Sequence, residues 1–142
     1  MHFYRMRDDT TERLLTGHNF HDTQWSPQGH RLAYCAGGKE GTILGVLDLE
    51  TKEKRTMLSS QDRIESPGWS PDGEKIVFSW NRAGNRDIWL IDTQTLATRQ
   101  LTFHLSADDE PVWDGITGRI LFTSDRGRGL EFSTLYWLPA PE

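Results

Sequence analysis

Polar side chains stand four and three residues before three tryptophans that are 44 residues apart. The tryptophans are Trp25, Trp69 and Trp113, and the polar residues before them are His21 and Asp22, Glu65 and Ser66, and Asp109 and Glu110. If the fold gathers them, these carboxylate, imidazole and hydroxyl groups could hold a cation or a basic peptide. The alternative is a solvated polar rim on loops that lead into strands.

A metal site is a second chemical hypothesis, and it rests on the first of these segments. His18, His21 and Gln24 are spaced three residues apart, with Asp22 between them. Imidazole and carboxylate groups bind zinc and manganese, although a spacing of three suits a helix better than the loop expected here. We therefore predict no cofactor and keep a bound cation as the alternative.

The sequence predicts no catalytic residue. His104 precedes Asp108, Asp109 and Glu110, from which an acid–base pair could be drawn, but carboxylates clustered before a tryptophan more often belong to a solvated loop. There is no G-x-S-x-G elbow, P-loop, EF-hand loop or C-x-x-C pair. The single cysteine, Cys35, excludes an intramolecular disulfide.

A period of 44 residues organises the elements that must position these groups. "WSPQG" at 25–29 and "WSPDG" at 69–73 each join a tryptophan to a short alternating segment, "RLAYC" or "KIVFS", and "RILFT" is the third copy. Alternation predicts strands, and Pro followed by Gly is typical of tight turns, so each copy opens with a β-hairpin. One aromatic residue of each segment is expected to pack between repeats; these residues are Tyr34, Phe78 and Phe122.

Each repeat also continues beyond its hairpin. Third strands are expected in "TILGVLDL", "DIWLIDT" and "TLYWLPA", and fourth strands in "TKEKRTMLS" and "TLATRQLT". Four antiparallel strands per 44 residues are the pattern of one β-propeller blade, which buries little until neighbours pack on its faces. The chain is thus predicted to be one all-β half-propeller of about three blades. The expected division is a partial blade with the last two strands at 1–17, blades at 18–60 and 61–104, and a partial blade with the first three strands at 105–142.

The remaining tryptophans do not occupy the repeat position of Trp25, Trp69 and Trp113, which anchor the repeat. Trp89 and Trp137 lie in predicted third strands and are expected to pack between blades. Trp80 lies at a strand end beside a glycine loop, and we predict that it is an exposed binding aromatic.

The middle copy, "SPGWSPDGEKIVFSWNRAGNRDIWLIDTQTLATRQLT", resembles the TolB-like, WD-repeat-like β-propeller repeat almost throughout. The first copy departs from it at "HDTQWSPQGHRLAYC", and the third keeps "DEPVW" and "SDRG" but lacks "SPDG", so the resemblance spans about residues 19 to 139. It implies that the segment before each tryptophan enters the innermost strand, and that its polar residues line the mouth of a central channel.

This resemblance is specific for the fold and weak for function, since such blades serve periplasmic scaffolds, peptidase domains and some lyases. We predict a non-catalytic module that binds or scaffolds a protein or peptide through the channel face. One alternative is the propeller part of an enzyme, either a prolyl-oligopeptidase-type gating domain or a metal-dependent lyase. Another is a self-assembling half-propeller without a ligand.

About three blades are too few to close a ring, since closed propellers have four blades or more. An unclosed ring exposes apolar faces and strand edges. Two explanations stay open: a segment of a longer propeller, or a homodimer that closes a ring of six blades, the number that the resemblance implies. In the dimer, "RLLT" at 13–16 of one chain would complete the C-terminal blade of the other.

A net charge of -5 argues against nucleic acid and anionic membranes as partners. No apolar stretch approaches the roughly 20 residues that span a bilayer, so membrane insertion is not predicted. "MHFYRMRDDTTER" at the start has no signal-peptide core. The cytoplasm is expected for the chain as it stands, and the periplasm if it is a segment of an exported TolB-type protein.

Overall fold

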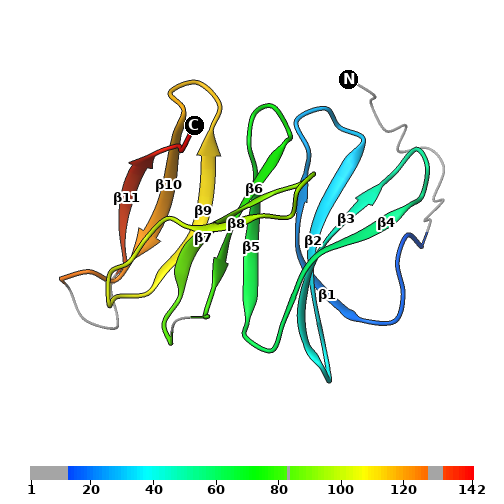
Figure 1. Ribbon diagram of the computed structural model, residues 1–142, viewed down its shortest axis with the longest axis horizontal. Helices are drawn as coiled ribbons and strands as arrows, with labels where there is room; N and C mark the ends of the chain where they lie inside the picture. Colours follow the sequence, from blue (N-terminus) through cyan, green and yellow to red (C-terminus); the bar gives the residue numbers. More distant parts are fainter. Residues whose placement is uncertain (1–12, 83, 128–132) are drawn as a thin grey trace, which may run out of the picture.

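The computed structural model describes residues 13–82, 84–127 and 133–142, and their regular structure is β throughout. Figure 1 shows three antiparallel sheets side by side, which we call blades A, B and C. Blade A comprises β1 Asn19–Trp25, β2 Arg31–Gly38, β3 Gly41–Asp48 and β4 Lys54–Ser60. Blade B comprises β5 Ile64–Trp69, β6 Lys75–Trp80, β7 Asp87–Asp92 and β8 Thr98–Gln100. Blade C comprises β9 Asp108–Asp114, β10 Arg119–Ser124 and β11 Thr134–Pro139. The described residues contain no helix long and apolar enough to cross a membrane.

Each blade is a meander in which strands that follow one another along the chain are paired. Turn chemistry explains where the chain reverses. In the β5–β6 hairpin, Gly73 has a φ of 73° and its N–H donates to the carbonyl of Ser70. After the third strands, Asp48 and Asp92 each accept backbone N–H groups from two and three residues further on. These hydrogen bonds hold the pKa of both carboxyl groups below its ordinary value.

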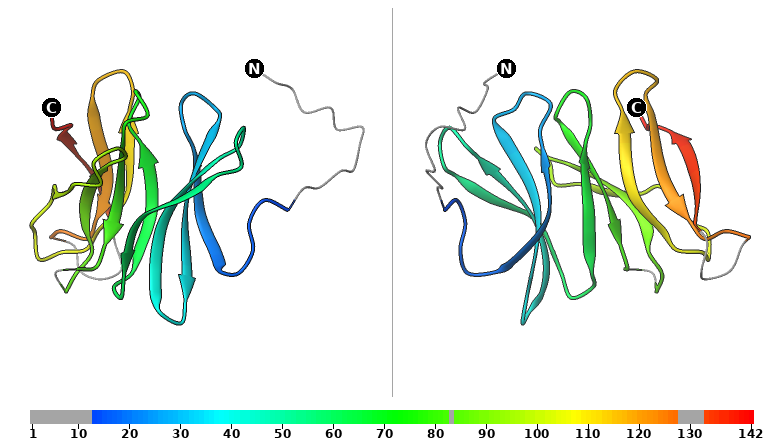
Figure 2. Two further views of the ribbon diagram at one scale, coloured as in Figure 1. Left: turned by 45° about the vertical axis from the view of Figure 1, so that its right-hand side comes forward. Right: turned by 180° about the vertical axis from the view of Figure 1, so that it is seen from behind.

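The blades fan out from their first strands. β1 contacts β5 and β5 contacts β9, whereas β4 and β8 form the opposite edges of their sheets. Both views of Figure 2 show that the sheets are twisted and separate from one another. The first strands are therefore the innermost ones, which is the arrangement of propeller blades.

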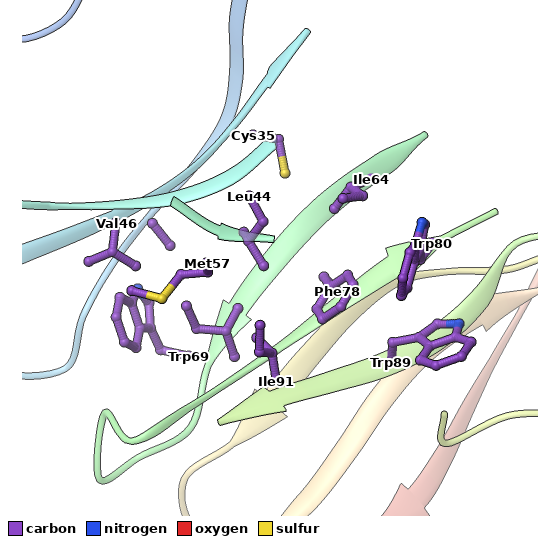
Figure 3. Close-up of a cluster of buried hydrophobic side chains, with 12 residues drawn as sticks. Cys35, Leu44, Val46, Met57, Ile64, Trp69, Phe78, Trp80, Trp89 and Ile91 are labelled. Carbon is purple, nitrogen blue, oxygen red and sulfur yellow. The ribbon is translucent and has the colours of Figure 1, made fainter. Parts of the chain in front are cut away.

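The main hydrophobic core lies between blades A and B (Figure 3). Blade A contributes mostly small and aliphatic side chains, namely Ala33, Cys35, Leu44, Val46 and Met57. Blade B contributes larger ones, namely Ile64, Trp69, Ile76, Phe78, Trp80, Trp89 and Ile91. A second cluster, around Val77, Leu90 and Ile120, joins blades B and C. Since complete burial of a large apolar side chain contributes roughly 1.5–3 kcal/mol, each blade depends on its neighbour for stability.

The alternating aromatic residues are buried in all three blades. Tyr34, Phe78 and Phe122 are 5%, 0% and 3% exposed. Phe78 faces blade A, whereas Tyr34 lies on the face of blade A that is turned away from blade B. Gly45 makes room for the tyrosine ring, because a Cβ at this position would lie 2.4 Å from Cζ of Tyr34.

Trp80 is not an exposed aromatic, and the prediction that it binds a ligand at the surface is wrong. Only 6% of Trp80 is exposed. It lies on the same face of β6 as Phe78, its ring contacts that of Trp89 with centroids 4.9 Å apart, and its Nε1–H donates to Oγ of Ser60 at 3.1 Å. The alternation of β6 continues to its last residue, which turns this side chain into the core.

Two other expectations differ from the structure. Trp89 is buried between blades, but Trp137 faces away from blade B and is 56% exposed. Residues 13–16 were expected to form a strand and form none, although Leu15 packs against the outer face of blade A. The first of the two strands expected within 1–17 lies outside the described residues.

Cys35 lies in the main core with no exposed surface. Burial raises the pKa of its thiol to about 12, and the negative charges of Asp22 and Glu65 add to the rise. Because the thiolate is the reactive form and an exposed cysteine has a pKa of about 8.5, a thiol-specific reagent at about pH 8 should modify the native protein roughly 1,000-fold more slowly than the unfolded chain. Equal rates for the native and the guanidinium-unfolded protein would contradict the burial.

Candidate functional site

The innermost strand of each blade contains one non-glycine residue with a left-handed backbone. These residues are Asp22, Ser66 and Glu110, with φ of 48°, 55° and 53°. Each lies where the register between the first and second strands shifts, so it belongs to a β-bulge. Such backbone conformations cost on the order of 1–3 kcal/mol and gather at binding sites. The 44-residue period therefore repeats a strained backbone position as well as a side-chain position.

The bulges border a groove that crosses the innermost strands of all three blades. Its volume is about 490 Å³, which falls in the range of ligand pockets. The groove is lined by residues 22–25 of blade A, 66–69 of blade B and 110–113 of blade C, together with Pro27. The same four repeat positions of each blade thus face one shared surface.

Aromatic, proline and acidic side chains line this groove. The three anchor tryptophans lie along it, and Trp25 is 52% exposed. Asp22 and Glu110 contribute carboxylates, whereas no Lys, Arg or His is found among the described residues that line the groove. Oδ2 of Asp22 accepts a hydrogen bond from the backbone N–H of Ser66 at 3.1 Å, which ties blade A to blade B. The surface suits a ligand that carries a cationic group beside apolar atoms.

A second and more shielded row of acidic groups lies beside the groove. The side chains of Glu65 and Asp109 are 14% and 19% exposed, and Arg86 pairs with both. Nη1 of Arg86 lies 2.5 Å from Asp109 Oδ2 and 3.7 Å from Glu65 Oε2. Asp109 also accepts the hydroxyl hydrogen of Ser79 at 2.6 Å, and Glu65 pairs with Arg63 at 2.5 Å. Interactions within the protein therefore compensate these two charges and link blades B and C.

The six residues expected at the channel mouth thus divide into two rows. One row borders the groove and consists of the exposed Asp22 and Glu110 and the half-buried Ser66. The residues four before each tryptophan, His21, Glu65 and Asp109, do not line the groove.

The repeat that builds the groove matches a known family of propeller domains. Residues 16–131, most of the chain, match the model of PD40, the TolB beta propeller domain. The chain belongs to the TolB β-propeller family. Among curated proteins, none matches the sequence.

Solved structures similar to this TolB-family chain include TolB itself, a lyase and the propeller domain of a protease. TolB from Acinetobacter baumannii has a TM-score of 0.78 at 24% identity, over 87% of this chain and 31% of that one. An oligogalacturonate lyase in complex with manganese has a TM-score of 0.69 at 20% identity, over 94% and 39% of the two chains. The β-propeller domain of the trilobed protease from Pyrococcus furiosus has a TM-score of 0.63 at 20% identity, over 87% and 42%. These likenesses show the fold, and this chain spans less than half the length of each structure.

The three metal ligands suggested by the sequence of this TolB-family chain have different surroundings. The ring of His18 packs edge-on against Phe20, with centroids 5.9 Å apart. Gln24 lies in the groove, where its backbone carbonyl accepts a hydrogen bond from Nε1 of Trp69 at 3.0 Å. His21 lines a separate hollow beside Gly37 and Gly38.

A different set of potential ligands converges instead. Donor atoms of His21, Asp22 and Glu65 lie within 4.8 Å of one another. Both oxygens of Glu65 already face guanidinium groups, those of Arg63 and Arg86. Because these two positive charges repel any further cation, the arrangement of His21, Asp22 and Glu65 does not fit a divalent ion.

The segment that follows His104 forms no exposed acid–base pair either. Nδ1 of His104 accepts the backbone N–H of Ser106 at 3.0 Å. Asp108 is fully buried, and its Oδ2 lies 2.5 Å from Nη2 of Arg126. These contacts give the segment a structural role between blades B and C.

Sequence reasoning missed two features of the site. Arg86, which neutralises the shielded row, stands in a glycine-containing loop, and only its place within "GNRD" could have drawn attention to it. Pro67 and Pro111 follow the left-handed residues directly. A proline inside a strand marks a bulge, so "ESP" and "DEP" were the available signals for the strained positions.

Proposed function

We propose that this chain is a non-catalytic TolB-type propeller module that binds an extended peptide segment with a basic side chain. The binding surface is the groove across β1, β5 and β9. The observation that supports this function is the composition of the groove: three tryptophans and two carboxylates, with no basic residue among the described residues that line it.

Each part of a basic peptide has a counterpart in the groove. The exposed ring of Trp25 offers a face to a guanidinium or ammonium group, an interaction of about 0.5–1 kcal/mol at an exposed site. Asp22 in blade A and Glu110 in blade C supply negative charge from two sides. The bulges interrupt the β1–β2, β5–β6 and β9–β10 ladders. At two of them the backbone N–H, that of Ser66 or Glu110, donates to a carboxylate of the protein, so recognition rests on the side chains of the groove. Because these residues stand on strands, little conformational entropy is lost on binding.

Positional peptide pools test this proposal. We expect fluorescein-labelled hexapeptide pools with Arg fixed at the third residue to bind more tightly than pools with Ala or Glu there, as measured by fluorescence anisotropy. The double variant Asp22→Asn with Glu110→Gln should weaken binding of the Arg pool about three- to ten-fold, since exposed ion pairs contribute about 0.2–1 kcal/mol each. Added salt should reduce the difference between the wild type and the variant.

A matched control is Glu50→Gln, which removes an exposed carboxylate from the turn after β3, outside the groove. This variant should bind the Arg pool as the wild type does. Equal binding of the Arg and Glu pools, or equal losses in the groove variant and in the control, would refute the proposal.

An enzymatic role is the second candidate, favoured by the convergence of His21, Asp22 and Glu65 and by the likeness to a manganese-bound lyase. The arginine partners of Glu65 oppose it, and we derive no metal-dependent step. A gating domain of a peptidase would also use the channel face, but such an enzyme needs a hydrolase domain in addition to the described blades.

A further inference from the structure

Blade C ends in an unpaired strand edge. Within the described residues, β11 pairs with β10 alone, whereas the third strands β3 and β7 pair with a fourth strand. The outer face of blade C is also uncovered, since Leu135 and Trp137 of β11 are 64% and 56% exposed. An edge and an apolar face of this kind together form a template for a further strand and sheet.

Blade B shows what a fourth strand does. The N–H of Ile88 in β7 donates to the hydroxyl oxygen of Thr102 at 2.9 Å, and its C=O accepts the N–H of Leu101 at 2.8 Å. Leu101 then packs into the cluster that joins blades B and C. The motif responsible is "RQLT" at 99–102.

The corresponding groups in blade C are those of Leu135. In blade B, Ile88 is paired with Ser79, and in blade C, Leu135 is paired with Thr123, which is the same repeat position 44 residues later. The N–H and C=O of Leu135 therefore point to the open edge of β11. They can pair with a hydroxyl acceptor and an N–H donor, as those of Ile88 do.

A second "R-x-L-T" segment exists at the other end of the described chain. Residues 13–16 read "RLLT". Leu15 packs into the cluster on the outer face of blade A, as Leu101 packs into the cluster ahead of blade C. Arg13, Leu14 and Thr16 are exposed. The segment thus has the sequence and the placement of a fourth strand, and it pairs with no strand among the described residues.

We propose that residues 13–16 of a second copy of this chain form the fourth strand of blade C. Thr16 of that copy accepts the N–H of Leu135, and the N–H of its Leu15 donates to the C=O of Leu135. The outer face of blade C then packs on the outer face of the second copy's blade A, which covers Trp137. The exchange is reciprocal and closes a two-fold ring of six blades, within the range of known propellers.

Light scattering on a sizing column tests this assembly with the protein as it is. We expect a single species of twice 16.3 kDa. Thr16→Val, which removes only the hydroxyl acceptor, should weaken the dimer, and Trp137→Asp should leave a monomer of 16.3 kDa. Ile116→Asp is the matched control, because Ile116 is 95% exposed in the β9–β10 turn, away from the proposed interface. Near-ultraviolet circular dichroism of each variant checks that the blades remain folded.

Several outcomes would overturn the proposal. One is a folded wild-type monomer at the concentrations used, which leaves the edge of β11 without a second copy. Another is a polydisperse assembly, because a two-fold ring stops at two chains. A dimer that survives both Thr16→Val and Trp137→Asp would have to use a different surface. The assembly does not depend on the peptide groove, so peptide binding by a monomer would leave the proposed function intact.

Discussion

Replacing Phe78 with alanine is expected to lower the free energy of unfolding by about 3–5 kcal/mol. Phe78 has no exposed surface and lies in the centre of the core between blades A and B (Figure 3). Its ring lies 6.1 Å from that of Trp80, centroid to centroid, and this rigid ring cannot collapse into the space that the phenyl group leaves. Since a small domain is stable by only about 5–15 kcal/mol, much of the stability of the chain would be lost. Urea unfolding followed by fluorescence and by circular dichroism measures the change.

A control substitution separates loss of packing from loss of apolar surface in general. Ile116→Ala removes aliphatic carbons from a side chain that is 95% exposed, and should change stability by less than about 0.5 kcal/mol. A loss below about 1 kcal/mol for Phe78→Ala would show that the blades do not depend on the contact between them.

The period of 44 residues is enough to predict most of the fold. Trp69, the Pro-Asp-Gly turn and the alternating segment that ends at Trp80 recur at one spacing, and one spacing implies one repeated unit. The burial of Phe78 follows from the same alternation. The burial of Trp80 was predicted wrongly because the neighbouring glycine loop was given more weight than two further residues of alternation.

The candidate site was less predictable, since it depends on how the blades meet. The repeat identifies Asp22, Ser66 and Glu110 as equivalent positions, but their positive φ comes from bulges that only pairing reveals. In the sequence, Glu65 and Asp109, which directly precede Ser66 and Glu110, looked equally available for binding. Arg86, however, pairs with both Glu65 and Asp109, although it lies in a loop some 20 residues from each of them in the sequence. Long-range pairing of this kind leaves no local pattern.

The second large effect is expected from Arg126, which pairs with one buried acidic side chain, Asp108, and acts electrostatically on another, Asp87. Asp108 is 0% exposed and Asp87 is 2% exposed. Nη2 of Arg126 lies 2.5 Å from Asp108 Oδ2, while Asp108 Oδ1 has no hydrogen-bond partner among the described residues. Arg126→Met keeps the length of the side chain and removes the charge. Because a buried carboxylate then lacks its cation, we expect a loss of about 3–5 kcal/mol at about pH 7.

The preceding blade supplies the control for this variant. Arg82 stands 44 residues earlier and covers the rings of Trp80 and Trp89, as Arg126 covers those of Phe122 and Tyr136. Ile64 occupies the position in blade B that Asp108 has in blade C. Arg82→Met therefore removes a cation–π contact without stranding a buried charge, and should cost about 0.5–1 kcal/mol.

The dependence on pH identifies the cause of the loss. Burial, and then the charge of Asp108, raises the pKa of Asp87 above its usual value of 3.8, whereas Arg126 lowers it. A carboxyl group whose pKa is higher in the folded state destabilises the fold at any pH above that value, and the penalty disappears as the pH falls toward the unfolded pKa. Without Arg126 the pKa of Asp87 rises further, so the difference in urea midpoint between Arg126→Met and the wild type should shrink from about pH 7 to about pH 4. The difference for Arg82→Met should stay constant over the same range, because no acidic group is stranded. Parallel pH profiles for the two variants would mean that Arg126 stabilises the chain by packing on Phe122 and Tyr136 rather than by compensating buried charge.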